Sequence, residues 1–368
     1  MERVVVLTGG GTAGHVMPHL AILDDLKQRG WHPIYVGTSG IEKKLVAHLI
    51  PFYEIRAGKL RRYFSFQNAL DVLNVLLGFF QSLVILFRQK PKVVFSKGGF
   101  VSVPVAWAAW MLGIPVVSHE SDYTPGLANR LIAKVAHRIL YTFSATKAFL
   151  PPHSTHVGLP VRASVLRGAK EKGEEFCGFS GVGLPTLLVI GGSQGSATLN
   201  RCLEDSLPRL GEKFRIVHIA GFRNADTAFQ SGISHYKRVE FLNAELADVL
   251  ALADIVVSRA GANSIFELLT LNKPMLLVPL EKGSRGDQIE NAHYFSQRGF
   301  ALTLREQDLN AESLCDRLDE LLRRLVEIKG SQSHSQEFAF QWEAVGRVID
   351  ALEKAAATTS RSKKLVQQ

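Results

Sequence analysis

Two glycine-rich turns, each placed directly after a short apolar run, constrain the fold of this chain more than any other feature. The first turn reads GGGTAGH over residues 9–15 and follows VVVLTG at 4–9, and the second reads GGSQGS over 191–196 and follows TLLVIGG at 186–192. Between a strand and a helix, such a turn directs backbone N–H groups and the positive end of the helix toward an anion. Glycines also permit a tight turn without any ligand, but two such turns favour a pair of phosphate sites.

Apolar runs of strand length alternate with longer helical stretches along the chain. This alternation predicts parallel sheets with helices on both faces, and 368 residues are too many for one compact core. We therefore expect an α/β fold with two doubly wound, Rossmann-like domains. The expected parts are a first domain over 1–160, a second over 161–336, a helix over 337–356 and a basic, disordered tail over 357–368.

Composition narrows the class of partner. Lys and Arg number 43 against 34 Asp and Glu, and the net charge of +9 favours an anionic partner, whether nucleic acid, anionic lipid or a phosphorylated substrate. No helix-turn-helix, zinc-finger or RNP-like pattern accompanies the basic residues, so we expect no nucleic-acid partner. The three cysteines are widely spaced, which predicts neither disulfides nor a zinc site and fits a reducing cytoplasm.

The first turn also matches the dinucleotide pattern GxGxxG at Gly9, Gly11 and Gly14. Dinucleotide binding further requires an acidic residue about 20 positions later, at the end of the second strand, where it bonds the ribose. The second strand here ends in Gly37 and Thr38. The sequence therefore disfavours a nicotinamide cofactor, and we expect no cofactor of any kind.

Five further motifs, taken in order with the two turns, resemble the MurG family over roughly residues 3–350. They are HESD at 119–122, TPGLAN at 124–129, GLPVR at 158–162, SRAGA at 258–262 and DQIENA at 287–292. The resemblance implies a GT-B fold, in which two Rossmann-like domains face a central cleft and a C-terminal helix returns to the N-terminal domain. It also implies an inverting transfer of N-acetylglucosamine from UDP-N-acetylglucosamine to the muramoyl C4 hydroxyl of undecaprenyl-linked lipid I, forming lipid II in peptidoglycan synthesis.

The resemblance assigns binding residues to both halves. In the N-terminal half the lipid diphosphate would contact Thr12, Ala13 and Gly14, with Asp122 and Asn129 as further contacts. In the C-terminal half the donor would be bound by Arg162 and Ser193 at its diphosphate, by Gln194 and Gly195 in the same turn, by the Leu242 backbone at uracil, by the helix start Ala262, Asn263, Ser264, Ile265, Phe266 and Glu267 around the nucleotide, and by Gln288 and Asn291 at the sugar hydroxyls. Glu267 would accept hydrogen bonds from the ribose. For Glu267, Gln288 and Asn291 the alternative is a solvated position on a helix surface.

Two motifs depart from the pattern of the family. Ala13 replaces a glycine of the usual GGTGGH, which narrows the approach of a phosphate but removes no N–H group. Ser121 and Asp122 replace the last two residues of the usual HEQN. At Asp122 a carboxylate therefore stands where an amide donor is usual, and an ionised carboxylate repels a diphosphate.

An inverting transfer to a hydroxyl needs one general base. His15 enters the helix after the first turn, and an imidazole pKa of about 6.5 suits a base at neutral pH; the alternative is that His15 caps the helix or binds phosphate. Glu120 would orient or replace His15, or accept hydrogen bonds for structure alone. Because no DxD or similar carboxylate pair is evident, we expect helix N-termini, Ser193 and Arg162 to meet the departing diphosphate without a metal.

Segment 69–88 is apolar on nearly all sides. The default interpretation is a buried helix, and its apolar run at 72–87 is shorter than the roughly 18–20 residues that a spanning helix needs. The alternative is an exposed patch that docks on an anionic membrane surface, bordered by Lys59, Arg61, Arg62, Arg88 and Lys90. That patch would place the protein peripherally on the cytoplasmic face of the cell membrane, with a cell-wall synthesis complex as a further partner.

Other functions suit the same two halves. One is a different GT-B enzyme, either a glycolipid glycosyltransferase or a UDP-N-acetylglucosamine 2-epimerase, and another is a UDP-sugar-binding regulator without catalysis. The motifs at 9–15 and 119–129 favour the lipid I transferase, because they belong to the acceptor side of the resemblance.

Overall fold

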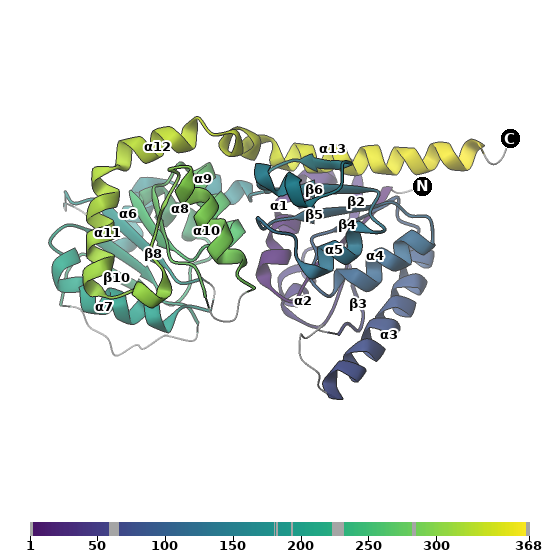
Figure 1. Cartoon of the computed structure of the whole chain (residues 1–368), viewed down its shortest axis with the longest axis horizontal. Coiled ribbons are helices and arrows are strands. Elements are labelled where there is room, and N and C mark those ends of the chain that lie inside the picture. The colour runs from purple at the N-terminus through teal and green to yellow at the C-terminus, as the bar shows by residue number, and fades with distance from the viewer. Residues whose placement is uncertain are drawn as a thin grey trace. The chain divides into compact units, whose positions relative to one another are not determined.

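The computed structural model describes residues 3–58, 66–179, 181, 183–192, 194–222, 232–281 and 285–365. The chain divides into two compact units, which we call the N-unit (residues 1–162 with 340–368) and the C-unit (residues 163–339) (Figure 1). Each unit contains a parallel sheet flanked by helices. The prediction of two Rossmann-like α/β domains is therefore confirmed.

The described part of the N-unit contains a sheet of seven parallel strands in the order β3-β2-β1-β4-β5-β6-β7. The order reverses between β1 and β4, and open α/β sheets bind their ligands outside the carboxyl ends of the strands at such a reversal. The strands are β1 Arg3–Thr8, β2 Trp31–Gly37, β3 Phe52–Glu54, β4 Val93–Ser96, β5 Val116–Glu120, β6 Arg138–Tyr141 and β7 Ser154–His156.

Helices cover both faces of this sheet, as the buried apolar strands require. One apolar cluster joins the strands to α1 (Met17–Gln28) and α13 (Gln336–Leu365). A second joins them to α3 (Phe66–Gln89) and α4 (Ser102–Met111). The remaining helical elements are α2 Ile41–Val46, α5 Leu127–Ala133, η1 Ala13–His15 and η2 Ser144–Phe149.

The last helix, α13, brings the chain back to the N-unit. Its residues Ile349 and Leu352 are buried in the same cluster as α1, and Arg29 forms an ion pair with Asp350 at 2.5 Å. The predicted return of a C-terminal helix is confirmed. The predicted disordered tail over 357–368 is wrong in its start, because the helix continues to Leu365. Residues 357–365 contain no Gly or Pro, and their Lys and Arg residues favour helix.

The described part of the C-unit contains six parallel strands in the order β10-β9-β8-β11-β12-β13, with the reversal between β8 and β11. The strands are β8 Thr186–Ile190, β9 Arg215–Ile219, β10 Tyr236–Val239, β11 Ile255–Ser258, β12 Met275–Leu277 and β13 Leu302–Thr303. The helical elements are η3 Ala163–Arg167, α6 Lys170–Cys177, α7 Ala197–Leu210, α8 Leu246–Leu252, α9 Ala262–Thr270, α10 Asp287–Gln297, η4 Glu306–Asp308, α11 Ala311–Arg323 and α12 Leu325–Ser333.

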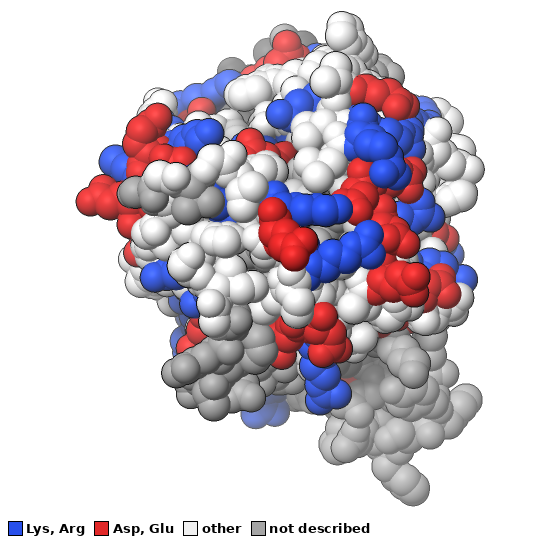
Figure 2. Space-filling model, turned by 90° about the vertical axis from the view of Figure 1, so that its left-hand side faces the viewer, with Lys and Arg blue, Asp and Glu red and all other residues white. Residues whose placement is uncertain are grey.

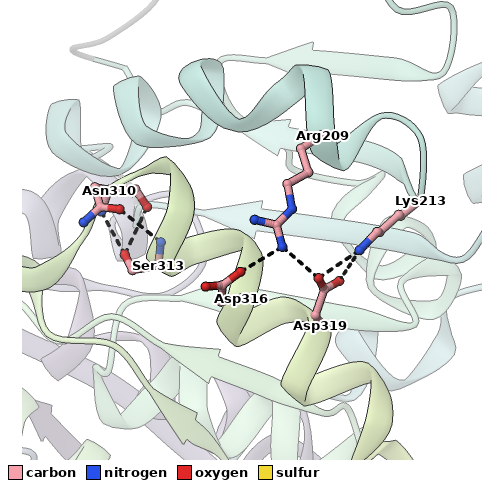
Figure 3. A network of polar contacts seen from close by, with 6 residues as sticks. All are labelled: Arg209, Lys213, Asn310, Ser313, Asp316 and Asp319. Atoms are coloured by element: carbon pink, nitrogen blue, oxygen red, sulfur yellow. Dashed lines mark hydrogen bonds and ion pairs between the residues drawn. The ribbon is translucent and has the colours of Figure 1, made fainter.

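Helices α7 and α11 of the C-unit are joined at the surface by an ion-pair network (Figure 3). Arg209 Nη2 lies 2.8 Å from Asp316 and 3.0 Å from Asp319, and Lys213 Nζ lies 2.6 Å from Asp319. The hydrogen bond from Lys213, followed by that from Arg209, lowers the pKa of Asp319. Acidic and basic side chains are interspersed over this end of the C-unit (Figure 2). A surface of mixed charge is typical of solvated faces, so we assign no anion site to it.

The structure places much of α3 at the surface, so the default interpretation of a buried helix is wrong. Leu73, Phe80 and Phe87 are 55%, 61% and 69% exposed. The segment Asp71–Gln89 is long and apolar enough to cross a membrane by length and composition alone, which is weak evidence for a span. A helix that is apolar on all sides has the same sequence pattern whether it is buried in a core or exposed on an apolar surface. The sequence therefore did not distinguish a buried α3 from an exposed one. The neighbouring Lys59, Arg61 and Arg62 lie outside the described residues.

Candidate functional site

Loops that follow β1, β4 and β5 meet at the carboxyl edge of the N-unit sheet. Gly99, in the loop after β4, has φ of 75°, and a Cβ there would lie 2.4 Å from the Gly10 carbonyl oxygen and 3.0 Å from His15 Nδ1. A Cβ on Gly98 would lie 2.6 Å from Asn129 Oδ1. Only glycine fits such close approaches. The sequence prediction missed this loop, although a glycine pair one residue after an apolar strand was a signal for it.

The orientation of His15 is set by its own turn. Its Nδ1 lies 2.9 Å from the Gly10 carbonyl oxygen and 3.2 Å from Thr12 Oγ1. Because a carbonyl oxygen only accepts hydrogen bonds, Nδ1 carries the proton and Nε2 carries the lone pair. The side chain is half-buried. A neutral imidazole with a basic Nε2 is what a general base requires.

A buried carboxylate supports the first turn from within. Glu42, at the start of α2, is 0% exposed; its Oε2 accepts from Gly11 N at 3.4 Å and its Oε1 accepts from Thr38 N at 3.0 Å. A Cβ on Gly10 would lie 2.6 Å from Oε1. An acidic residue therefore does follow the second strand, but it faces the turn and occupies an N–H group that would otherwise attract phosphate. Residues 12–14 form the outer, more exposed side of the turn.

Glu120 ends β5 and organises the loop that follows. Its carboxylate is 4% exposed and accepts from Asp122 N at 3.0 Å, Gly126 N at 3.0 Å and Asn129 Nδ2 at 2.8 Å. A carboxylate with these partners fits the structural alternative better than that of a base. Asp122 and Asn129 are both half-buried. The Glu120 side chain therefore joins Asp122 and Asn129, and the structure brings these three predicted residues of the acceptor side together.

A buried ammonium lies beneath these loops. Lys97 directly follows β4 and is 1% exposed, and its Nζ lies 2.5 Å from His119 Nδ1 and 2.5 Å from Ser121 Oγ. Burial lowers the pKa of Lys97 to about 7, against the raising effects of Glu120 and Asp122. The sequence carried no signal for this residue, because a lysine after a strand is ordinary.

His119 links this ammonium to the interior of the N-unit. Its Nε2 lies 3.0 Å from the Gly158 carbonyl oxygen, to which it donates, so Nδ1 accepts from Lys97. Burial, followed by the charge of Lys97, holds the pKa of His119 well below its usual range. His19 on α1 is also fully buried, and desolvation is the main cause of its lowered pKa. Both rings are therefore neutral at pH 7.

The second glycine turn lies at the end of β8, at the reversal of the C-unit sheet. Gly195 N donates to Gly192 O at 2.9 Å and closes the turn. Gln194 is exposed and Gly195 is half-buried, while Ser193 lies outside the described residues. Ser196 caps α7 by accepting from Leu199 N. The turn therefore presents Gln194 at its surface, and its role in ligand binding stays a prediction.

Arg259 supports the second turn, a role that the sequence motif SRAGA did not reveal. Arg259 is 8% exposed. Its Nη2 donates to Ser196 Oγ at 2.5 Å and to Glu306 Oε1 at 2.5 Å. Its Nη1 donates to Val278 O at 3.2 Å. A guanidinium that spans three segments in this way positions the turn and places a positive charge beside it.

The remaining predicted donor residues fall into two groups. Those with buried side chains can offer a ligand only their backbone groups: Leu242, Ala262, Ile265, Phe266 and Asn291. Those that are half-buried, with part of the side chain accessible, are Arg162, Asn263, Ser264, Glu267 and Gln288.

The helix α10 separates two residues that the sequence treated alike. Asn291 is 0% exposed and its Nδ2 donates to Ala260 O at 3.2 Å. Gln288 Oε1 accepts from Leu280 N at 3.0 Å, at a half-buried position. Asn291 thus supports the loop before α9, and Gln288 is the better placed of the two to read a sugar hydroxyl.

No group of three or more His, Cys, Asp or Glu side chains that could hold a metal ion is present among the residues that the structure describes. Metal independence stays a prediction.

Comparisons with known proteins agree with this architecture. The N-terminal domain of glycosyltransferase family 28 matches residues 5–141, and its C-terminal domain matches residues 186–342. A UDP-N-acetylglucosamine--N-acetylmuramyl-(pentapeptide) pyrophosphoryl-undecaprenol N-acetylglucosamine transferase of Geobacillus thermodenitrificans (strain NG80-2) is 48% identical over 342 residues, which cover 92% of this chain and 94% of the relative. A protein of the same name from Legionella pneumophila (strain Lens) is 44% identical over 333 residues, which cover 89% and 91%.

Solved structures show the same fold. The crystal structure of Acinetobacter baumannii MurG matches with a TM-score of 0.74 at 24% identity, covering 96% of this chain and 99% of that one. A putative UDP-N-acetylglucosamine 2-epimerase from Listeria monocytogenes matches with a TM-score of 0.69 at 13% identity, covering 96% of each chain. The GT-B architecture that the motifs implied is therefore confirmed.

Proposed function

Because this chain belongs to the MurG family within glycosyltransferase family 28, we propose that it transfers N-acetylglucosamine from UDP-N-acetylglucosamine to the muramoyl C4 hydroxyl of undecaprenyl-linked lipid I. The products are lipid II and UDP. The relatives that carry the name of this activity match over about nine-tenths of the chain. The site residues below are named on the geometry of each unit taken separately.

The observation that carries the proposal is the contact between His15 Nδ1 and the Gly10 carbonyl oxygen. Nδ1 donates to Gly10 O at 2.9 Å, so Nε2 accepts the proton of the acceptor hydroxyl. As that proton leaves, the hydroxyl oxygen bonds to the anomeric carbon, and the bond from this carbon to UDP breaks on the opposite face. Inversion follows, because a single displacement has one nucleophile. Glu120 contributes by positioning Asn129 and the backbone of the loop after β5.

The diphosphate carries two negative charges in the donor, and it gains one more when UDP departs. In the C-unit the second glycine turn, with Ser193, Gln194 and Gly195, and the positive end of α9 would meet those charges. Arg162 adds a guanidinium, whose planar fork of donors suits a phosphate group. Glu267, half-buried on α9, would accept from the ribose hydroxyls. This set of donors does not require a divalent metal.

A lipid-linked acceptor requires the enzyme to work at a membrane surface. Exposed apolar side chains of α3, including Phe80 and Phe87, would insert among lipid headgroups, and the exposed Arg88 and Lys90 would attract anionic lipid. Lipid I and UDP-N-acetylglucosamine meet on the cytoplasmic face of the membrane, which is where we place the protein.

The activity is tested by UDP release from UDP-N-acetylglucosamine with and without lipid I or a short-chain analogue. Release that depends on the acceptor, with a disaccharide-bearing lipid as the product, supports the proposal. Release of a free epimer without acceptor identifies a 2-epimerase, and binding of UDP-N-acetylglucosamine without release identifies a regulator. Addition of EDTA should leave the rate unchanged, and an absolute need for magnesium at saturating substrate would contradict the metal-free mechanism.

Membrane docking is tested by cosedimentation with vesicles that contain phosphatidylglycerol. The double variant Phe80→Ser, Phe87→Ser should lose most of its vesicle binding, since each exposed aromatic side chain contributes roughly 1.5–3 kcal/mol when it leaves water. Trp342→Ser is the matched control, because Trp342 is an exposed aromatic residue (58%) on α13. Equal vesicle binding by all three proteins would exclude α3 as the docking surface.

A further inference from the structure

Lys97 combines full burial with a charge, and the described mechanism does not use it. Its Nζ contacts two neutral groups, His119 Nδ1 and Ser121 Oγ, each at 2.5 Å. A buried ammonium is costly unless nearby opposite charges compensate it. The residues on either side of Ser121 in the chain are Glu120 and Asp122, and both raise the pKa of Lys97.

These two carboxylates are not equivalent. Glu120 accepts three hydrogen bonds from its own loop and is 4% exposed. Asp122 is half-buried, one residue beyond the Ser121 hydroxyl that Lys97 contacts. An ionised Asp122 at the rim of a diphosphate site repels that diphosphate, because both are negatively charged. The Lys97 ammonium, when protonated, reduces this repulsion.

Lys97 also lies close to the proposed base. The loop that it begins packs Gly99 against His15, as the 3.0 Å separation of a Gly99 Cβ from His15 Nδ1 shows. The other groups that face the ammonium are His119 on β5 and His19 on α1, and burial lowers the pKa of both. Because both rings are neutral at pH 7, Lys97 is the group that supplies positive charge beneath the acceptor loops.

We propose that Lys97 is a positioning residue for acceptor binding: its buried ammonium compensates Asp122, so that the diphosphate of the lipid-linked acceptor binds beside a carboxylate. In the usual HEQN motif a neutral amide stands at position 122. Here the charges of Lys97 and Asp122 compensate each other instead. This inference rests on the proposed function, because it concerns the acceptor of that reaction.

The test is a double-mutant cycle with Lys97→Met, Asp122→Asn and the double variant, compared with the unmodified protein. For each protein, kcat and the KM values for a lipid I analogue and for UDP-N-acetylglucosamine are measured at pH 7. We expect Lys97→Met to raise the acceptor KM about tenfold, which corresponds to a coupling within the usual range for interacting charges. The donor KM should change less than about twofold, and Asp122→Asn in the Lys97→Met background should restore most of the acceptor KM.

Two controls separate this role from a structural one. Lys273→Met removes a half-buried lysine, which donates to Ala251 O and Ala253 O in the C-unit, and it should leave the acceptor KM unchanged. Lys97→Gln keeps a donor for His119 and Ser121 without the charge, and replaces Lys97→Met if that variant does not fold.

The outcomes are distinct. Additive effects of the two substitutions, equal changes in both KM values, or a Lys97 variant that folds only together with Asp122→Asn would overturn the acceptor role. Absence of acceptor-dependent UDP release by the unmodified protein would instead remove the proposed function itself.

Discussion

The two glycine turns occupy the same place in two sheets of the same topology, yet their surroundings differ in chemistry. Each follows the first strand of its unit, at the point where the strand order reverses. The first turn is surrounded by ionisable groups: the Glu42 carboxylate behind it, and the His15 imidazole and the Lys97 ammonium beside it. The second turn is fixed by Ser196 and by the guanidinium of Arg259. The two turns thus share a place in the topology and differ in the side chains behind them.

The difference agrees with the roles that we propose. A turn at which a proton is transferred needs groups that titrate near neutral pH. A turn that receives a departing diphosphate needs charges that do not titrate, and a guanidinium meets that need. Substitutions in the two units test this contrast, and the largest effect is expected at His15.

Replacing the base should abolish most of the activity. We expect His15→Gln to lower kcat by about 10²–10⁴-fold, the usual contribution of a general base, while the donor KM changes little. Steady-state UDP release with a lipid I analogue measures both constants. The matched change in the second turn, Gln194→Ala, should act mainly on the donor KM. A kcat for His15→Gln within about tenfold of the unmodified value would refute the assignment of the base.

Removing the guanidinium behind the second turn should destabilise the C-unit. Arg259 pairs with Glu306 at 2.5 Å, and their side chains are 10% and 17% exposed. Arg259→Met leaves a mostly buried carboxylate without its partner, which should lower the free energy of unfolding by about 3 kcal/mol. Urea denaturation measures the change.

The surface pair of Arg317 with Glu320 provides the control for this prediction. Their side chains are 45% and 29% exposed, and the pair is separated by 2.6 Å. Arg317→Met should change the free energy of unfolding by less than about 1 kcal/mol, because solvent screens exposed pairs. Similar losses for Arg259→Met and Arg317→Met would show that the second turn does not depend on Arg259.

Acid should destabilise the C-unit through His218. Burial lowers the pKa of this imidazole to about 3 in the folded state, whereas the unfolded chain takes up a proton near the ordinary pKa of about 6.5. As the pH falls from 6.5 toward 3 the unfolded state binds more protons, so the free energy of unfolding decreases, by up to about 1.4 kcal/mol per pH unit. Urea denaturation at pH 6.5 and 5.5 should show a weaker pH dependence for His218→Gln. An unchanged dependence would mean that other groups control acid stability.

The smallest effect is expected at the carboxylate behind the first turn. Glu42→Gln removes a negative charge that accepts from Gly11 N and Thr38 N, and the first turn should then bind inorganic pyrophosphate about fivefold more tightly, as a nearby like charge is lost. Calorimetric titration measures the affinity. Glu54→Gln removes an exposed carboxylate paired with Lys43 and should leave the affinity unchanged. Weaker pyrophosphate binding by Glu42→Gln would show that Glu42 organises the turn rather than opposing an anion.

The sequence predicted what depends on local pattern. Alternating apolar runs revealed most strands of both sheets but not the short edge strands β3 and β7, and the turn before α1 placed His15 at the carboxyl edge of β1. Partners that come from distant segments carried no pattern: Glu42 lies 31 positions from Gly11, and Arg259 lies 63 positions from Ser196. These contacts exist only once parallel strands align their carboxyl ends at one edge.

The sequence pattern also did not show which helical side chains are exposed to solvent. Gln288 and Asn291 have the i, i+3 spacing of one helix face, but Asn291 is completely buried and bonds Ala260 O. Segment 69–88 was apolar enough for a core, yet Phe80 and Phe87 of α3 are exposed. Whether a side chain faces the interior depends on how its helix is packed, and helix periodicity does not contain that information.

The return of α13 to the N-unit has a consequence for synthesis. The chain leaves this unit after Arg162 and re-enters it at Phe340, so the side chains that complete its core, such as Ile349 and Leu352, are synthesised after the whole C-unit. Domains made first usually fold first. Here the C-unit is completely synthesised while the core of the N-unit still lacks the side chains of α13. A chain that terminates before α13 would therefore expose apolar surface of the N-unit, and quality control would recognise the fragment there.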